Sequence, residues 1–132
     1  MNAMKAHAAP VLGAENVPES VQWYCDNLHF TCPEGIFMAG DNIPVYAVLK
    51  RDDIEIHIQI RRRKPHPAPR EPVESDAYFF TADTKSLYKH CKSQDIKIIR
   101  PIADSQYGLT DFCIEDLVGN RLNFGWESEH LT

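Results

Sequence analysis

The sequence predicts an α+β fold built from two βαβββ modules, and three observations support this prediction. A proline-rich segment, residues 61–74, divides the chain near its middle. Each half contains a short apolar stretch, an amphipathic helical pattern and three further strand patterns. The halves also repeat at an offset of 66 residues, and the matched pairs are Ser20 with Ser86, Cys25 with Cys91, and Phe30 with Ile96.

The first half opens with a predicted strand at residues 10–14, followed by a capped helix. Asn16 suits the N-cap, because its side-chain oxygen can accept a hydrogen bond from the first helical turn. Pro18 lies in that turn, and Glu19 follows the cap by three residues. The buried face of the helix is predicted from apolar residues at helical spacing, namely Val21, Tyr24, Cys25 and Leu28.

Three strands complete the first half, separated by turns rich in Gly, Asn and Asp. Their predicted ranges are residues 35–38, 45–49 and 54–60.

The second half repeats this order. Residues 77–81 form a predicted strand, and Asp83 is expected to cap a helix that runs through Lys92. The remaining strands are predicted at residues 96–99, 110–114 and 121–126. The modules are therefore placed at residues 8–60 and 75–127 of a single domain spanning residues 1–132. Neither module is large enough to bury its sheet alone, so we expect them to pack together or to pair with a second chain.

The last predicted strand follows a tight turn. Gly119 and Asn120 both tolerate the positive φ that such a reversal requires. Leu122, Phe124 and Trp126 then alternate with polar or small residues, which predicts that these three side chains face the core. The same alternation places Asn123 on the opposite face.

Composition excludes several classes of function. The net charge is −5, and segment 61–74 carries +3, so the rest of the chain carries −8. An acidic body disfavours binding to nucleic acid. No apolar run approaches the ~20 residues of a membrane span, and the N-terminus is too short and polar for a secretory signal. Four cysteines without Cys-x-x-Cys spacing predict reduced thiols and a cytoplasmic protein.

Several segments resemble the vicinal oxygen chelate superfamily, which holds glyoxalase I, extradiol dioxygenases and bleomycin resistance proteins. The resemblance covers essentially the whole chain and is closest to the bleomycin resistance proteins. It rests on the Pro-Val-Leu opening at residues 10–12, on residues 53–58, and on the pattern Phe-x-x-x-Asp-x-x-Gly-Asn at residues 112–120. The resemblance implies the two-module fold predicted above.

In metal-dependent members, four ligands lie on one concave sheet face. The corresponding positions here are Ala9, His57 (or Glu55 if the register differs by two), Asp76 and Asn123. Ala9 cannot bind a metal, and an amide such as Asn123 is a weak ligand. A divalent ion needs about three or four N or O donors. His57 and Asp76 alone do not suffice, although His7 could supply a third donor.

Aromatic residues on the same face suggest a site for an organic ligand. We expect Phe37, Tyr46, Tyr78 and Phe112 to line the concave face, with Tyr46 and Phe112 at matching positions of the repeat. Flat aromatic walls suit planar heterocycles, and acidic surroundings suit cations. The predicted ligand-binding set therefore comprises Phe37, Tyr46, His57, Asp76, Tyr78, Phe112 and Asn123.

The leading hypothesis is a metal-free small-molecule-binding protein of the bleomycin-resistance type, without cofactor or catalytic residue. It would be a homodimer that sequesters its ligand in a cleft at the dimer interface. The alternative is a divalent-metal-dependent lyase or dioxygenase that uses His57, Asp76 and His7. A third possibility is a family member that binds an unrelated metabolite.

Overall fold

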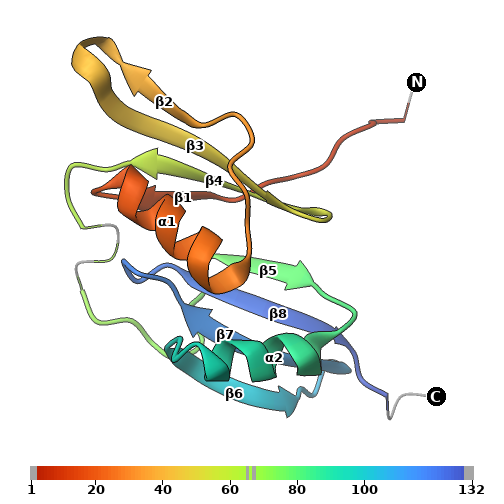
Figure 1. Cartoon of the computed structure of the whole chain (residues 1–132). Coiled ribbons are helices and arrows are strands. Elements are labelled where there is room, and N and C mark those ends of the chain that lie inside the picture. Colours follow the sequence, from red (N-terminus) through yellow and green to blue (C-terminus); the bar gives the residue numbers. More distant parts are fainter. Residues whose placement is uncertain (1–2, 65, 67, 130–132) are drawn as a thin grey trace.

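The computed structural model describes residues 3–64, 66 and 68–129, and it confirms the α+β prediction. Two four-stranded sheets each carry one helix (Figure 1). The first sheet has the order β1 (Val11–Ala14), β4 (Ile54–Ile60), β3 (Ile43–Arg51) and β2 (Ile36–Ala39). The second has the order β5 (Ala77–Phe80), β8 (Arg121–Glu127), β7 (Leu109–Glu115) and β6 (Ile98–Asp104). The helices are α1 (Val17–Leu28), α2 (Thr84–Ser93) and the short 3₁₀ turn η1 (Gly40–Asn42).

Both sheets have the same pairing. β1 runs parallel to β4 and β5 runs parallel to β8, whereas the other pairs are antiparallel. Helix α1 packs on β3 and β4, and α2 packs on β6, β7 and β8. Figure 1 shows both helices in front of the sheets. Each sheet thus has a helix-covered face and a helix-free face. No helix among the described residues is long and apolar enough to cross a membrane.

The start of α1 is as predicted. The amide of Glu19 donates to Asn16 Oδ1 at 3.1 Å, and Val21, Tyr24 and Leu28 are buried. The helix ends at His29, whose φ of 57° closes it with a left-handed residue.

The expected cap of α2 is wrong in its side-chain detail. Asp83 does precede the helix, but its side chain makes no capping hydrogen bond. Its backbone, with φ −100° and ψ 56°, lacks the extended conformation that aims a cap at the helical amides. The Asp83 carboxylate is therefore available for other contacts.

One apolar core joins both modules on the helix-covered side. Tyr24 and Phe30 from the first module belong to the same cluster as Cys91, Phe112 and Phe124 from the second. Packing between modules buries what a single sheet and helix would leave exposed.

Trp126 does not join this core, contrary to the prediction from its alternation with Leu122 and Phe124. Its side chain is 43% exposed. It lies beyond Phe124 along β8, beside a small hollow that polar residues at the start of α2 also line, among them Asp83 and Lys85. The apolar alternation therefore continues past the end of the core.

The turn between β7 and β8 fastens the two modules together. Gly119 has a φ of 94°, as its position in the turn requires. Asp116 Oδ2 accepts from the Tyr24 hydroxyl at 2.6 Å and from Asn120 Nδ2 at 2.9 Å, and the same amide donates to the Gly13 carbonyl at 3.0 Å. Burial raises the pKa of Asp116, although the hydrogen bonds from Tyr24 and Asn120 oppose this shift. The turn thus contacts both α1 and β1.

Candidate functional site

A hydrogen-bonded group of three side chains lies on the helix-free face of the first sheet. Along β4, Ile56 and Ile58 are buried in the core, so Glu55 and His57 face the other way. The Tyr46 hydroxyl lies 2.6 Å from His57 Nδ1, and Glu55 Oε2 lies 2.7 Å from His57 Nε2. In a neutral imidazole, Nε2 carries the proton because a carboxylate only accepts, and Nδ1 accepts from Tyr46. Both ring nitrogens are thus engaged.

Glu55 also attracts nearby cations. Lys50 Nζ lies 3.8 Å from Glu55 Oε1, and His7 Nε2 lies 3.6 Å from the same oxygen. The hydrogen bond from His57 lowers the pKa of Glu55, and the positive charge of Lys50 adds to this effect. The structure therefore brings His7, Glu55 and His57 together.

The helix-free face of the second sheet carries a different polar group, centred on Arg100. The Arg100 guanidinium donates to Asn123 Oδ1 and lies 3.5 Å from Asp111 Oδ1. The Tyr78 hydroxyl donates to Asp111 Oδ2 at 2.8 Å. Burial raises the pKa of Tyr78, and its bond to Asp111 raises it further. Asn123 and Tyr78 thus lie in one network, as adjacent positions of the paired strands β5 and β8.

This network depends on the absence of a side chain at Gly125. A Cβ atom built there would lie 2.1 Å from the Tyr78 hydroxyl and 2.6 Å from Asp111 Cβ. Glycine leaves the room in which the Tyr78 side chain crosses β8 to reach Asp111.

Asp76 contacts the linker instead of the His57 group. Arg70 donates to both of its carboxylate oxygens, at 2.9 and 3.2 Å, and the Arg121 amide donates at 2.8 Å. His66 Nε2 lies 3.3 Å away. Burial favours a higher pKa for Asp76, but the bonds from Arg70 and Arg121 outweigh it and lower the pKa. Asp76 ties the linker to β8.

The expectation that Phe112 lies on the concave face is wrong. Phe112 is fully buried on the helix-covered face, where its ring contacts Tyr88 of α2 and stacks on Phe124. The reason is the register. Ala47 pairs with Ile58 and Phe112 pairs with Phe124, so Phe112 corresponds to Ala47, and Tyr46 corresponds to Asp111. The offset is 66 residues between β4 and β8 but 65 between β3 and β7, because the β7–β8 turn is longer.

Phe37 has the predicted placement. It pairs with Tyr46 across β2 and β3 and is 46% exposed. Other exposed apolar side chains also lie on the helix-free faces, namely Val11, Tyr78 and Phe80. These faces therefore combine half-buried polar groups with exposed apolar surface.

The donor set does not fit a metal centre as it stands. A search of residues 3–64, 66 and 68–129 finds no group of three or more His, Cys, Asp or Glu able to hold a metal ion. A cation bound by His57 would have to replace the hydrogen bond to Tyr46 or to Glu55. Asp76 is likewise engaged by Arg70.

Arg100 and Asp111 were not predicted as site residues. The strand expected at residues 96–99 stops one residue before Arg100, whereas β6 runs from Ile98 to Asp104. Asp111 was passed over because the repeat, taken at a constant offset, matched Tyr46 with Phe112. A separate register for each strand pair would have identified it.

Comparison with known proteins agrees with this architecture. The sequence profile of the Glyoxalase/Bleomycin resistance protein/Dioxygenase superfamily matches residues 6–124. No curated protein shows significant similarity to the sequence.

Three solved structures illustrate the similarity of fold. A glyoxalase-related enzyme from Clostridium phytofermentans has a TM-score of 0.75 at 14% identity, covering 96% of this chain and 98% of the other. The bleomycin-binding protein from Streptomyces verticillus, complexed with copper(II)-bleomycin, has a TM-score of 0.70 at 23% identity, with coverages of 97% and 100%. TioX from Micromonospora sp. ML1 has a TM-score of 0.70 at 14% identity, with coverages of 93% and 99%.

The profile match extends over nearly the whole chain, through both sheets and both helices. This chain belongs to the Glyoxalase/Bleomycin resistance protein/Dioxygenase superfamily.

Proposed function

We propose that this protein binds a small organic molecule on the helix-free faces of its sheets and holds it without making or breaking bonds, as a bleomycin-resistance-type protein would. The observation that carries the proposal is the state of the polar groups. His57 is bonded to Tyr46 and Glu55, and Asn123 is bonded to Arg100. Exposed apolar side chains lie on the same faces. Engaged polar groups beside exposed aromatic surface favour recognition over metal chemistry.

The proposal includes a second copy of the chain. Single helix-free faces are open, and apolar residues such as Phe37 and Phe80, exposed to 46% and 66%, would gain cover from a partner. A homodimer in which two such faces meet would turn them into clefts. We place this dimer in the cytoplasm, where the four cysteines, all free in the structure, would stay reduced.

Bleomycin is the first ligand to test, because two of the similar solved structures are bleomycin-binding proteins in complex with bleomycin or copper(II)-bleomycin. Planar and cationic groups of such a ligand would suit aromatic side chains in an acidic protein. Isothermal titration should show saturable binding that weakens about tenfold or more when Tyr78 is replaced by Ala. Tyr107→Ala, at an 81% exposed turn position, is the matched control. Absence of both heat and competition at micromolar concentrations would exclude bleomycin as the ligand.

The dimer has its own test. Sedimentation equilibrium should give twice the mass of the 132-residue chain, and Phe80→Lys should shift the population toward the monomer because a charge is costly in an apolar interface. Val73→Lys, at an 82% exposed linker position, should leave the mass unchanged. A wild-type protein that stays monomeric at high concentration would exclude the shared cleft.

A second candidate function is a divalent-metal-dependent lyase or dioxygenase. It is favoured by one observation, the proximity of His7 and His57 to Glu55. Plasma emission analysis of purified protein for Mn, Fe, Ni and Zn separates the two functions. Stoichiometric metal that is lost in His57→Ala would support the enzyme and contradict the metal-free proposal.

A further inference from the structure

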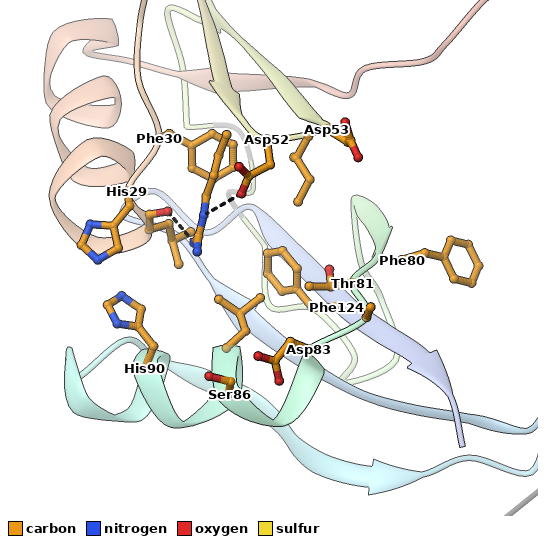
Figure 2. Close-up of a pocket in the computed structure, with 15 residues that line it drawn as sticks. His29, Phe30, Asp52, Asp53, Phe80, Thr81, Asp83, Ser86, His90 and Phe124 are labelled. Atoms are coloured by element: carbon orange, nitrogen blue, oxygen red, sulfur yellow. Dashed lines mark hydrogen bonds and ion pairs between the residues drawn. The ribbon is translucent and has the colours of Figure 1, made fainter. Parts of the chain in front are cut away.

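A cavity of about 520 Å³ lies between the modules, on the helix-covered side of the sheets (Figure 2). Its walls come from four segments that are distant in sequence: the end of α1, the β3–β4 turn, the segment between β5 and α2, and one face of α2. This volume is within the range of sites that enclose small organic ligands.

The cavity is separate from the proposed ligand site. Phe124 lines it from β8, and the neighbouring Asn123 belongs to the opposite, helix-free face. Neither Tyr46 nor His57 contributes to its lining. A molecule in this cavity would therefore occupy a second site.

The floor of the cavity is apolar. Leu28, Phe30 and Phe124 line it and are at least 96% buried, and Ile54 and Leu87 extend the apolar surface. A ligand would need a hydrocarbon or aromatic body to cover this floor.

The charged groups around the floor favour a cation. Asp52, Asp53 and Asp83 line the cavity against a single cation, Arg51, which gives a formal charge of −2 with neutral histidines. Arg51 is already committed, because its guanidinium donates to the Leu28 carbonyl at 2.8 Å and lies 3.8 Å from Asp52. It is therefore not free to receive an anionic ligand.

Asp83 is the carboxylate best suited to meet a cation. It makes no capping hydrogen bond to α2, and Figure 2 shows it beside Ser86 along the α2 side of the cavity. A carboxylate with open lone pairs next to an apolar floor forms a charge-assisted hydrogen bond with an ammonium group.

The histidine pair at the other end adds an acceptor. His90 Nε2 lies 2.7 Å from the Asn27 carbonyl, so this nitrogen carries the proton. In the neutral ring, Nδ1 is then an acceptor. The His29 ring lies beside it, with a centroid distance of 4.9 Å. Acceptors thus predominate among the uncommitted polar groups of the cavity.

We propose that this inter-module cavity is a second binding site, which takes a small organic ammonium ion with an apolar or aromatic body. The apolar part would cover Phe30 and Phe124, and the ammonium group would meet Asp83. This proposal goes beyond the one for the helix-free faces and does not depend on it.

The test uses three probes that share one apolar body. Phenylbutylammonium, phenylbutanol and phenylbutyrate are titrated into the full-length protein, with amide chemical shifts as the readout. We expect the ammonium ion to bind best and to shift amides around Phe30, Asp83 and His90. Equal binding of the alcohol or the carboxylate would overturn the proposal, as would a lack of shifts at millimolar ammonium ion.

Two pairs of variants test the position of the site. Asp83→Asn should weaken ammonium binding about tenfold, whereas Asp41→Asn, which removes an exposed aspartate in η1, should not. Ser86→Trp should block the cavity, whereas Gln94→Trp at the far end of α2 should not. Circular dichroism checks that each variant is folded. Equal effects within either pair would contradict the proposed site.

His57→Ala separates this site from the helix-free face. It should leave ammonium binding unchanged. If the ammonium ion instead shifted amides around His57 and this response vanished in His57→Ala, the second site would be refuted.

Discussion

At the scale of single residues, the polar side chains of the helix-free faces are satisfied by one another. His57 uses both ring nitrogens, toward Tyr46 and Glu55. Asn123 uses its carbonyl oxygen toward Arg100 and its amide toward the Ala77 carbonyl at 3.2 Å. Such pairing avoids the cost of half-buried unsatisfied groups. It also fixes the side chains in place before a ligand arrives, which reduces the entropy lost on binding.

Gly125 permits one of these arrangements, and its replacement is a direct test. In Gly125→Ala, the new methyl group would clash with the Tyr78 hydroxyl and with Asp111. We expect a loss of about 1–3 kcal/mol in the free energy of unfolding, measured by urea denaturation.

Gly40→Ala is the matched control for this change. A Cβ atom at Gly40 meets no atom within 4 Å, and its φ lies outside the positive range. Stability of Gly125→Ala equal to that of Gly40→Ala would show that Tyr78 does not cross β8 as described.

At the scale of elements, most of the fold could be predicted from the sequence. β4 has the predicted bounds, Ile54–Ile60, because a regular alternation between two turns defines both ends. The start of α1 followed from the chemistry of Asn16. β6 was displaced by two residues at its start, since Ile96 is buried as an apolar residue but precedes the strand.

The site was less predictable, because it depends on pairing between strands. One extra residue in the β7–β8 turn moves Phe112 to the core and brings Asp111 to the helix-free face. A one-residue change of register reverses every side chain of a strand. The inter-module cavity was not predicted at all, because its walls come from segments far apart in the chain.

The tie between the linker and the second sheet has a definite pH dependence. Folding lowers the pKa of Asp76 below its ordinary value of 3.8. Its stabilising contribution is therefore present at neutral pH and is lost as the pH falls from about 3.8 through the lowered value. Wild type should be more stable than Asp76→Asn at pH 7, and the difference should shrink in acid, as measured by chemical denaturation across pH.

Arg70→Met provides the second measurement of this tie. Removing the guanidinium should remove much of the pH-dependent difference, because Arg70 bonds to both oxygens of Asp76. A difference between wild type and Asp76→Asn that grows toward acid would contradict the assigned direction.

At the scale of the whole molecule, the two modules share one core and one polar fastening. The apolar cluster includes residues of both halves, and Asp116 and Asn120 contact Tyr24 and Gly13 across the boundary. Neither half retains its buried surface if the other unfolds. The chain should therefore behave as one cooperative unit.

The two tryptophans allow this to be measured. Trp23 lies on α1 and Trp126 on β8, so Trp126→Phe leaves a reporter in the first module and Trp23→Phe leaves one in the second. The unfolding curves of each variant, followed by fluorescence and by circular dichroism, should coincide. Fluorescence that changes at a lower denaturant concentration in only one variant would show that its module unfolds alone.

The course of the linker has a practical consequence. No residue described between 61 and 76 belongs to the apolar cluster, and the basic residues 61–64 are exposed. Trypsin should therefore nick this stretch first. The two fragments would stay associated through surfaces that the cut does not touch, so the gene could be expressed as two complementing pieces that reassemble.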